Sequence, residues 1–278
     1  MSKPLILITN DDGYQSKGIK SLVDSVKDLW RIIFVAPDRP QSGMGHAISV
    51  NKPIRCFKLD FFSSVNAYSC SGTPVDCVKM GFFLLKGEKP DLILSGINHG
   101  SNVSTNILYS GTMSAAVEGA LAGIPSIGYS LTDYSEDADF DYSKKIVRLI
   151  SKKVMKDGLK LGTCLNVNIP NVQEDEIKGI KPCRQGKAFW DDTFDHRKDP
   201  LGKDYYWLTG SFGSKEPSTD TDVNYLENNY VTIVPTQYDL TCHDSVEKHR
   251  RIGRVVGVHH NFVVCPSCGA LCSDDVDH

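Results

Sequence analysis

Two adjacent aspartates, Asp11 and Asp12, follow the first apolar run of the chain and are the first candidates for chemistry. In a tight turn both carboxylates can point at one place, whereas neighbouring side chains within a strand face opposite ways. Two carboxylates about 4 Å apart repel by roughly 4 kcal/mol at an effective dielectric of 20, so a cation or a shifted pKa is expected. The competing interpretation is structural, with the pair forming an Asx turn and a helix N-cap.

Two further polar residues could complete a cation site with these aspartates. Ser42 follows the apolar run 31–36, and Asn98 follows the run 92–94. In an open α/β sheet, ligands bind outside the carboxyl ends of the strands, so these loops can converge. Carboxylate, hydroxyl and amide oxygens suit Mg²⁺ or Mn²⁺, and an open coordination shell leaves room for a phosphate. Taken singly, Ser42 and Asn98 are also typical turn-stabilising residues.

Another group of polar residues lies directly before a helix of small residues. Ser110, Gly111 and Thr112 would present hydroxyls and free backbone N–H groups at the N-terminus of that helix, which is a binding site for anions. An ordinary N-cap is the competing interpretation. Glu118 lies on the same helix and could either support the site or be a solvated surface acid.

Histidines offer two further possibilities. His46 and His99 lie in the loops that carry Ser42 and Asn98, and an imidazole is well suited to protonate a leaving group. Either could equally be a loop histidine in water. Near the C-terminus, a set that resembles zinc ligands in composition contains His259, His260, Cys265, Cys268 and Cys272. A second C-x-x-C is missing, so a tail with reduced thiols is the competing interpretation.

Several other nucleotide-binding and hydrolase motifs are missing from the sequence. The chain has no P-loop, no G-x-S-x-G nucleophile elbow, and no G-x-G-x-x-G after its first apolar run. A D-x-D at 220–222 lies in a polar segment away from any expected strand end. We interpret it as a surface or helix-capping pair.

Apolar runs of about five residues alternate with helix-length amphipathic segments in the first half, as in βαβ units with a buried parallel sheet. The pattern predicts strands at 5–8, 31–36, 92–94, 125–129, 165–169 and 230–235, with shorter alternating strands in 47–70. Helices are expected up to Trp30, from the cap Thr73 and Pro74 onwards, at 112–122 and at 144–154. Residues 95–102 are expected to form a long polar loop, and the polar segment 173–222, which carries aromatic residues, a hairpin arm.

Length and composition limit the class of protein. The 278 residues are enough for one large or two small domains, and 40% hydrophobic with 23% charged residues is typical of a globular chain. A net charge of −3 predicts no broad nucleic-acid surface. Nine cysteines, an odd number, and the lack of a secretory signal favour the cytoplasm, and no apolar run is long enough to span a membrane.

Five ordered blocks of the sequence resemble the SurE survival-protein family of metal-dependent 5′(3′)-nucleotidases, also described as acid phosphatases. The blocks are ITNDDG (8–13), APDR (36–39) leading to Ser42-Gly43, SGTPVDCV (71–78), SGINHGSN (95–102), and YSGT (109–112) leading to Glu118-Gly119. The resemblance is strong over about residues 4–131 and looser over 165–170 and 231–241. The segment 255–278 departs from the family pattern.

This resemblance implies roles for eight residues. One divalent cation per subunit, Mg²⁺ or Mn²⁺, would be held by Asp11, Asp12, Ser42 and Asn98, the two aspartates being catalytic. The phosphate would be bound by Asn102, Ser110, Gly111 and Thr112. The family also implies a Rossmann-like core and a homodimer or homotetramer that exchanges an extended hairpin, which we expect within 185–230.

We therefore expect an α/β fold with a Rossmann-like three-layer core, a mostly parallel sheet and a C-terminal hairpin arm. The expected division is a catalytic core at 1–172, a C-terminal region with the arm at 173–258, and a Cys-rich tail at 259–278. The predicted function is divalent-metal-dependent hydrolysis of nucleoside 5′-monophosphates, with 3′-monophosphates as further candidates. A non-catalytic nucleotide-binding module on the same fold is the alternative hypothesis.

Overall fold

The computed structural model describes residues 3–60, 62, 65–213, 216–255, 262–264 and 271–273. The chain forms two compact units, Met1–Tyr238 and Asp239–His278. The first unit contains the sheet, the helices that cover it and the hairpin. In the second unit the structure describes α6 (His243–Val255) and a short antiparallel pair, β12 (Phe262–Val264) and β13 (Leu271–Ser273).

A sheet of nine strands forms the centre of the first unit, and its mostly parallel pairing confirms the prediction. Its strand order is β3-β4-β2-β1-β5-β6-β7-β11-β8, and antiparallel pairing occurs at β3–β4 and β7–β11. The strand bounds are β1 Leu5–Thr9, β2 Arg31–Pro37, β3 Cys56–Leu59, β4 Asn66–Cys70, β5 Leu92–His99, β6 Ser126–Leu131, β7 Thr163–Ile169, β8 Gly179–Pro182 and β11 Tyr230–Gln237. β8 was not predicted, and among the described residues of 47–70 only β3 and β4 are strands.

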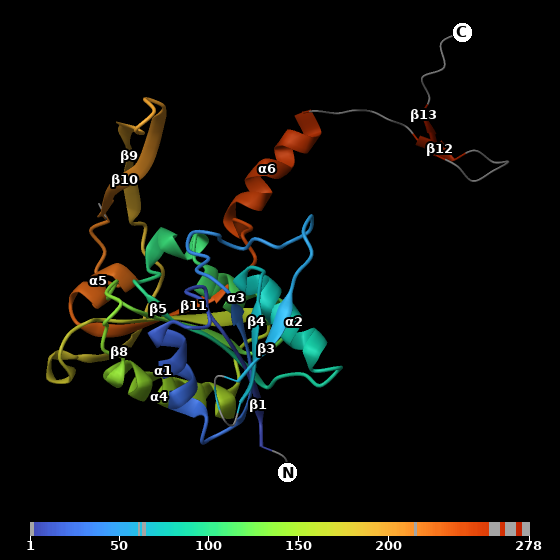
Figure 1. The fold of residues 1–278 in the computed structure, drawn as a ribbon. Coiled ribbons are helices and arrows are strands. Elements are labelled where there is room, and N and C mark those ends of the chain that lie inside the picture. Colours follow the sequence, from blue (N-terminus) through green and yellow to red (C-terminus); the bar gives the residue numbers. More distant parts are fainter. Residues whose placement is uncertain are drawn as a thin grey trace, which may run out of the picture. The chain divides into compact units, whose positions relative to one another are not determined.

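Helices cover both faces of this sheet and create the three expected layers (Figure 1). Because side chains alternate across a strand, Ile6 and Ile8 of β1 pack into the core shared with α1 (Lys17–Val26) and α4 (Asp141–Asp157). Leu5 and Leu7 pack into the opposite core with α2 (Pro74–Leu84) and α3 (Gly111–Leu121). Burial of both faces explains the continuous apolar strands.

Capping residues determine where the helices begin. Thr73 caps α2 in a capping box, in which its side chain accepts from the Asp76 backbone N–H and the Asp76 side chain accepts from the Thr73 N–H. Pro74 occupies the first turn, as predicted. α3 begins at Gly111, one residue before the predicted start, because Ser110 is its N-cap.

The prediction of a loop at 95–102 is wrong for the first half of that segment, because β5 continues to His99. Its backbone stays paired with β6, with Asn98 opposite Ser130 and an irregularity between Ser95 and Asn98. Gly96 has φ +122°, and a Cβ there would lie 2.3 Å from the Tyr129 carbonyl oxygen. Asn98 is therefore held by the sheet instead of by a free loop.

A long antiparallel hairpin confirms the predicted arm. β9 (Phe189–Lys198) and β10 (Asp204–Gly213) pair over their full length and form a separate two-stranded sheet.

The shorter elements α5 (Asp222–Glu227), η1 (Ser104–Leu108) and η2 (Glu174–Glu176), like α6, were not predicted. Of the proposed zinc ligands, His259, His260, Cys265 and Cys268 lie outside the described residues. Across the described part of the chain, no helix is both long and apolar enough to cross a bilayer.

Candidate active site

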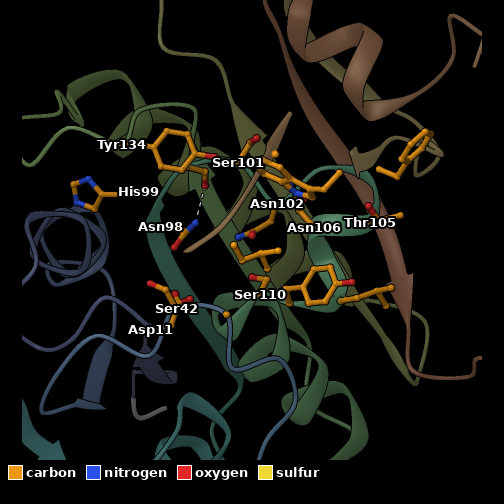
Figure 2. Close-up of a pocket in the computed structure, with 18 of the residues that line it drawn as sticks. Asp11, Ser42, Asn98, His99, Ser101, Asn102, Thr105, Asn106, Ser110 and Tyr134 are labelled. Atoms are coloured by element: carbon orange, nitrogen blue, oxygen red, sulfur yellow. Dashed lines mark hydrogen bonds between the residues drawn. The ribbon is translucent and has the colours of Figure 1, made fainter. Parts of the chain in front are cut away.

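A cavity of about 880 Å³ lies at the carboxyl ends of the central strands. Five of the eight residues singled out from the sequence line it, and Figure 2 shows them converging from separate elements: Asp11, Ser42, Asn98, Asn102 and Ser110. Asp11 follows β1, Ser42 follows β2, and Ser110 caps α3. Asn98 lies at the end of β5, and Asn102 follows that strand. The expectation that the strand-end loops converge is confirmed.

Asp11 and Asp12 lie on either side of a boundary between two cavities. Asp11 lines the large cavity, whereas Asp12 lines a neighbouring one of about 640 Å³, and His99 lines both. Asp12 accepts a hydrogen bond from the His99 backbone N–H at 3.3 Å. The end of β5, the strand next to β1 in the sheet, therefore holds the Asp12 carboxylate.

Burial leaves this pair of carboxyl groups poorly compensated. Desolvation raises the pKa of Asp11, and the neighbouring Asp12 charge raises it further. Desolvation also raises the pKa of Asp12. Among the described residues that line the large cavity there is no lysine or arginine. A site with excess negative charge and oxygen ligands suits a hard divalent cation.

Ser42 and Asn98 supply the neutral oxygens of this site. The Asn98 side-chain N–H donates to the Gly100 carbonyl at 2.7 Å. Its carboxamide oxygen then points toward Asp11 and Ser42 in Figure 2. The loop of Ser42 is tied to the first aspartate, because the Gln41 N–H donates to the Asp11 carbonyl at 2.7 Å.

The N-terminus of α3 packs directly on Asp11. The Thr112 hydroxyl donates to the Asp11 carboxylate, and a Cβ on Gly111 would lie 2.6 Å from the Asp11 Cβ. Gly111 and Thr112 therefore contact Asp11 behind the cavity wall, while Ser110 is on that wall. The Ser110 side chain also accepts from the Met113 N–H at 3.0 Å, so the N-cap interpretation is correct for it.

A buried network of asparagines that sequence reasoning missed holds Asn102. Its backbone N–H donates to Asn168 Oδ1 at 2.7 Å, and its carbonyl accepts from Asn166 Nδ2 at 2.7 Å. Its own side chain donates to Ser130 Oγ at 2.8 Å. The sequence contained a signal for this network, since Asn166 and Asn168 share one face of an otherwise apolar strand.

The two histidines occupy different environments. His46 Nε2 lies 3.0 Å from the Glu118 carboxylate, which also pairs with Lys79. Glu118 is therefore a buried, paired residue and not a solvated surface acid. His99 lines the cavity, and its Nδ1 lies 2.9 Å from the Ser135 carbonyl oxygen.

The 220–222 motif does cap a helix, because the Thr221 side chain accepts from the Asn224 N–H at the start of α5.

The chain is similar to known proteins over most of its length. Residues 6–192 match the family model described as Survival protein SurE. The 5′-nucleotidase SurE of Christiangramia forsetii is 54% identical over 247 residues, which cover 88% of this chain and 95% of the relative. The 5′-nucleotidase SurE of Flavobacterium psychrophilum is 51% identical over 248 residues, covering 89% and 96%. The crystal structure of the SurE protein from Aquifex aeolicus superposes with a TM-score of 0.78 at 40% identity, covering 90% of this chain and 99% of that one.

Proposed function

The chain belongs to the SurE survival-protein family, and on that premise we propose that it is a divalent-metal-dependent 5′-nucleotidase. It hydrolyses nucleoside 5′-monophosphates to nucleoside and phosphate. This activity is supported by the relatives named 5′-nucleotidase, to which the chain is 54% and 51% identical. Activity on 3′-monophosphates is a further part of the proposal. The structural observation that best supports it is the buried Asp11 carboxylate on a cavity wall shared with the N-terminus of α3, with the neighbouring Asp12 carboxylate lining the adjacent cavity.

Asp11, Asp12, Ser42 and Asn98 would hold one Mg²⁺ or Mn²⁺. Two carboxylates, a hydroxyl and an amide oxygen match the ligand preference of these ions, and the raised pKa values of the aspartates mark an electrostatic cost that a cation relieves. When bound, such a cation polarises the phosphoryl group and orients the attacking oxygen. The Thr112 hydroxyl, which donates to Asp11, fixes the direction of that carboxylate.

Asn102 and Ser110, which line the cavity, would bind the phosphate oxygens with their side chains, and Gly111 and Thr112 would bind them through the backbone N–H groups of the first turn of α3. The support is the position of Ser110, Gly111 and Thr112 at the N-terminus of α3, where the helix dipole and backbone N–H groups favour an anion, and the position of Asn102 on the wall of the same cavity. The Asn166–Asn168 network keeps the Asn102 backbone in one place. Donors that are fixed in advance stabilise developing charge without reorganisation during the reaction.

We further propose that the hairpin is exchanged between subunits of a homodimer or homotetramer. Supporting this is the apolar surface of the arm, where Phe194, Tyr206 and Trp207 are all mostly exposed. A cytoplasmic location is also proposed, and it is supported by the free thiols of the six cysteines whose side chains the structure describes.

Phosphate release from a panel of nucleoside 5′- and 3′-monophosphates tests the function. The purified chain is assayed after chelator treatment and again with Mg²⁺, Mn²⁺ or Zn²⁺ added back. We expect release from 5′-monophosphates that the chelator abolishes and that Mg²⁺ or Mn²⁺ restores. No release under any of these conditions would contradict the enzyme and favour the nucleotide-binding module.

A further inference from the structure

The cavity is larger than a phosphate group and a cation at its polar end would need. At about 880 Å³ it lies within the range of sites that enclose a whole small molecule, so a phosphate group and a cation occupy only part of it. Away from the aspartates, its wall carries the apolar and aromatic side chains of Leu108, Tyr109, Phe189, Trp190 and Leu208, beside the polar residues Thr105, Asn106, Asp192 and Thr209. These residues come from η1, from the residue that follows it and from the hairpin, not from the nine-stranded sheet.

Trp190 is held in one orientation on this wall. Its indole N–H donates to Asn106 Oδ1 at 2.7 Å, and its ring centroid lies 5.5 Å from that of Phe212. Although it is fixed on these sides, Trp190 keeps 40% of its surface exposed and lines the cavity. An aromatic ring that is immobile before binding loses little conformational entropy when a ligand stacks on it.

The start of the hairpin is also fixed relative to the phosphate end. The buried Asp222 carboxylate accepts from the Ser104 N–H and the Gly186 N–H, each at 2.8 Å, and so joins η1 to the segment that enters β9. The Ala188 carbonyl accepts from the hydroxyls of Ser104 and Thr105 at 3.0 and 2.8 Å. η1 leads directly to Ser110, so these hydrogen bonds connect the aromatic wall to the anion-binding turn.

We propose that this aromatic wall is the nucleobase subsite of the cavity, with Trp190 as the residue on which the base stacks. The inference rests on the proposed function and adds the part of the substrate that distinguishes a nucleotide from a sugar phosphate without a base. A nucleoside monophosphate has a polar phosphate end and a flat apolar base, and the cavity has the same two kinds of surface at its two ends. Aromatic stacking accepts any base because every base has a π-face.

The test compares a substrate that carries a base with one that does not. Initial rates are measured for 5′-AMP and for ribose 5-phosphate, and the ratio of their kcat/KM values is the readout. We expect the wild-type chain to favour 5′-AMP, and the substitution Trp190→Ala to lower the ratio by about tenfold. Trp190→Phe keeps an aromatic ring, so its ratio should be close to the wild-type ratio.

Trp207→Ala is the matched control. Trp207 lies on the same hairpin and is 59% exposed, but it is not among the residues that line the cavity, so its substitution should leave the ratio unchanged. A wild-type ratio near one, or a Trp190→Ala ratio equal to the wild-type value, would overturn the inference. Failure of the proposed function is distinguishable, since the wild-type chain would then release no phosphate from 5′-AMP.

Discussion

The two ends of the cavity are built from different kinds of structure. At the polar end, Asp11, Asn102 and Ser110 are buried and are attached to the sheet or to a helix that packs on it. At the aromatic end, Tyr109, Trp190 and Leu208 are 40–62% exposed. Tyr109 follows η1, and the other two belong to the hairpin. Residues at the polar end are therefore held by the same packing that stabilises the fold, whereas the aromatic end depends on a few hydrogen bonds.

This difference predicts that a substitution costs more at the polar end than at the aromatic end. A change at the polar end disturbs buried groups that must be paired, so each substitution is costly. A change on an exposed aromatic wall removes contact area without leaving a buried polar group unpaired.

The largest effect is expected for Asp11→Asn. The change removes one of the two carboxylates that would hold the cation but preserves side-chain size, so kcat should fall by about a thousandfold or more. Asp24→Asn is the matched control, because Asp24 pairs with Lys27 on the exposed face of α1. Mn²⁺ titration of both variants followed by spectroscopy should show weakened binding only at position 11. Near-wild-type turnover with metal present would refute this assignment of the site.

The next effect in size is expected for Asn168→Ala, which removes the acceptor of the Asn102 backbone N–H. An unpaired buried donor costs about 1–3 kcal/mol, so the free energy of unfolding should drop by that amount. We expect kcat/KM to drop by about ten- to a hundredfold because Asn102 is no longer held. Urea unfolding and steady-state kinetics provide both measurements.

Thr232→Val is the control for that network. Thr232 lies opposite Asn168 in the sheet, and among the described residues its buried hydroxyl has no hydrogen-bond partner. Its replacement by an isosteric apolar side chain should leave both activity and stability close to wild type. Equal losses in the two variants would mean that the network contributes only to general packing.

The same contrast describes what the sequence could predict. Asp11, Ser42 and Asn98 could be grouped because strand ends in a parallel sheet share one edge, and Thr73 with Pro74 marks a helix start through local hydrogen bonding. Such features depend on a few consecutive residues. The strand-end rule and the resemblance together anticipated most of the polar end.

The features that were missed depend on partners far away in the chain. β5 extends beyond Leu94 because β6 continues to pair with it, and no signal within 95–99 encodes that partner. Asp222 resembled a surface acid because its partners, Ser104 and Gly186, lie 118 and 36 residues away. The aromatic wall likewise requires η1 and the hairpin to meet, which only the tertiary structure determines.

A smaller effect is expected for Asp222→Asn, which tests the connection between the two ends. The amide can accept only one of the two hydrogen bonds that the carboxylate oxygens accept from Ser104 and Gly186. We expect the kcat/KM ratio of 5′-AMP to ribose 5-phosphate to fall by about threefold, through loss of one backbone hydrogen bond. Asp220→Asn is the matched control, since Asp220 is exposed and pairs with Arg184. An unchanged ratio at position 222 would show that the aromatic end does not need this anchor.

The smallest effect on catalysis is expected from the outer part of the hairpin. Tyr206 stacks on His196 with ring centroids 4.8 Å apart, is 60% exposed, and does not line the cavity. Tyr206→Ser should change the kcat/KM for 5′-AMP per subunit by less than about twofold, since substitutions on an exposed surface have small effects. Light scattering after size-exclusion chromatography should show weaker self-association if this surface contacts a second copy. A large loss of turnover with intact assembly would mean that the arm acts on the cavity along its whole length, and the division between its anchored start and its exposed outer part would be wrong.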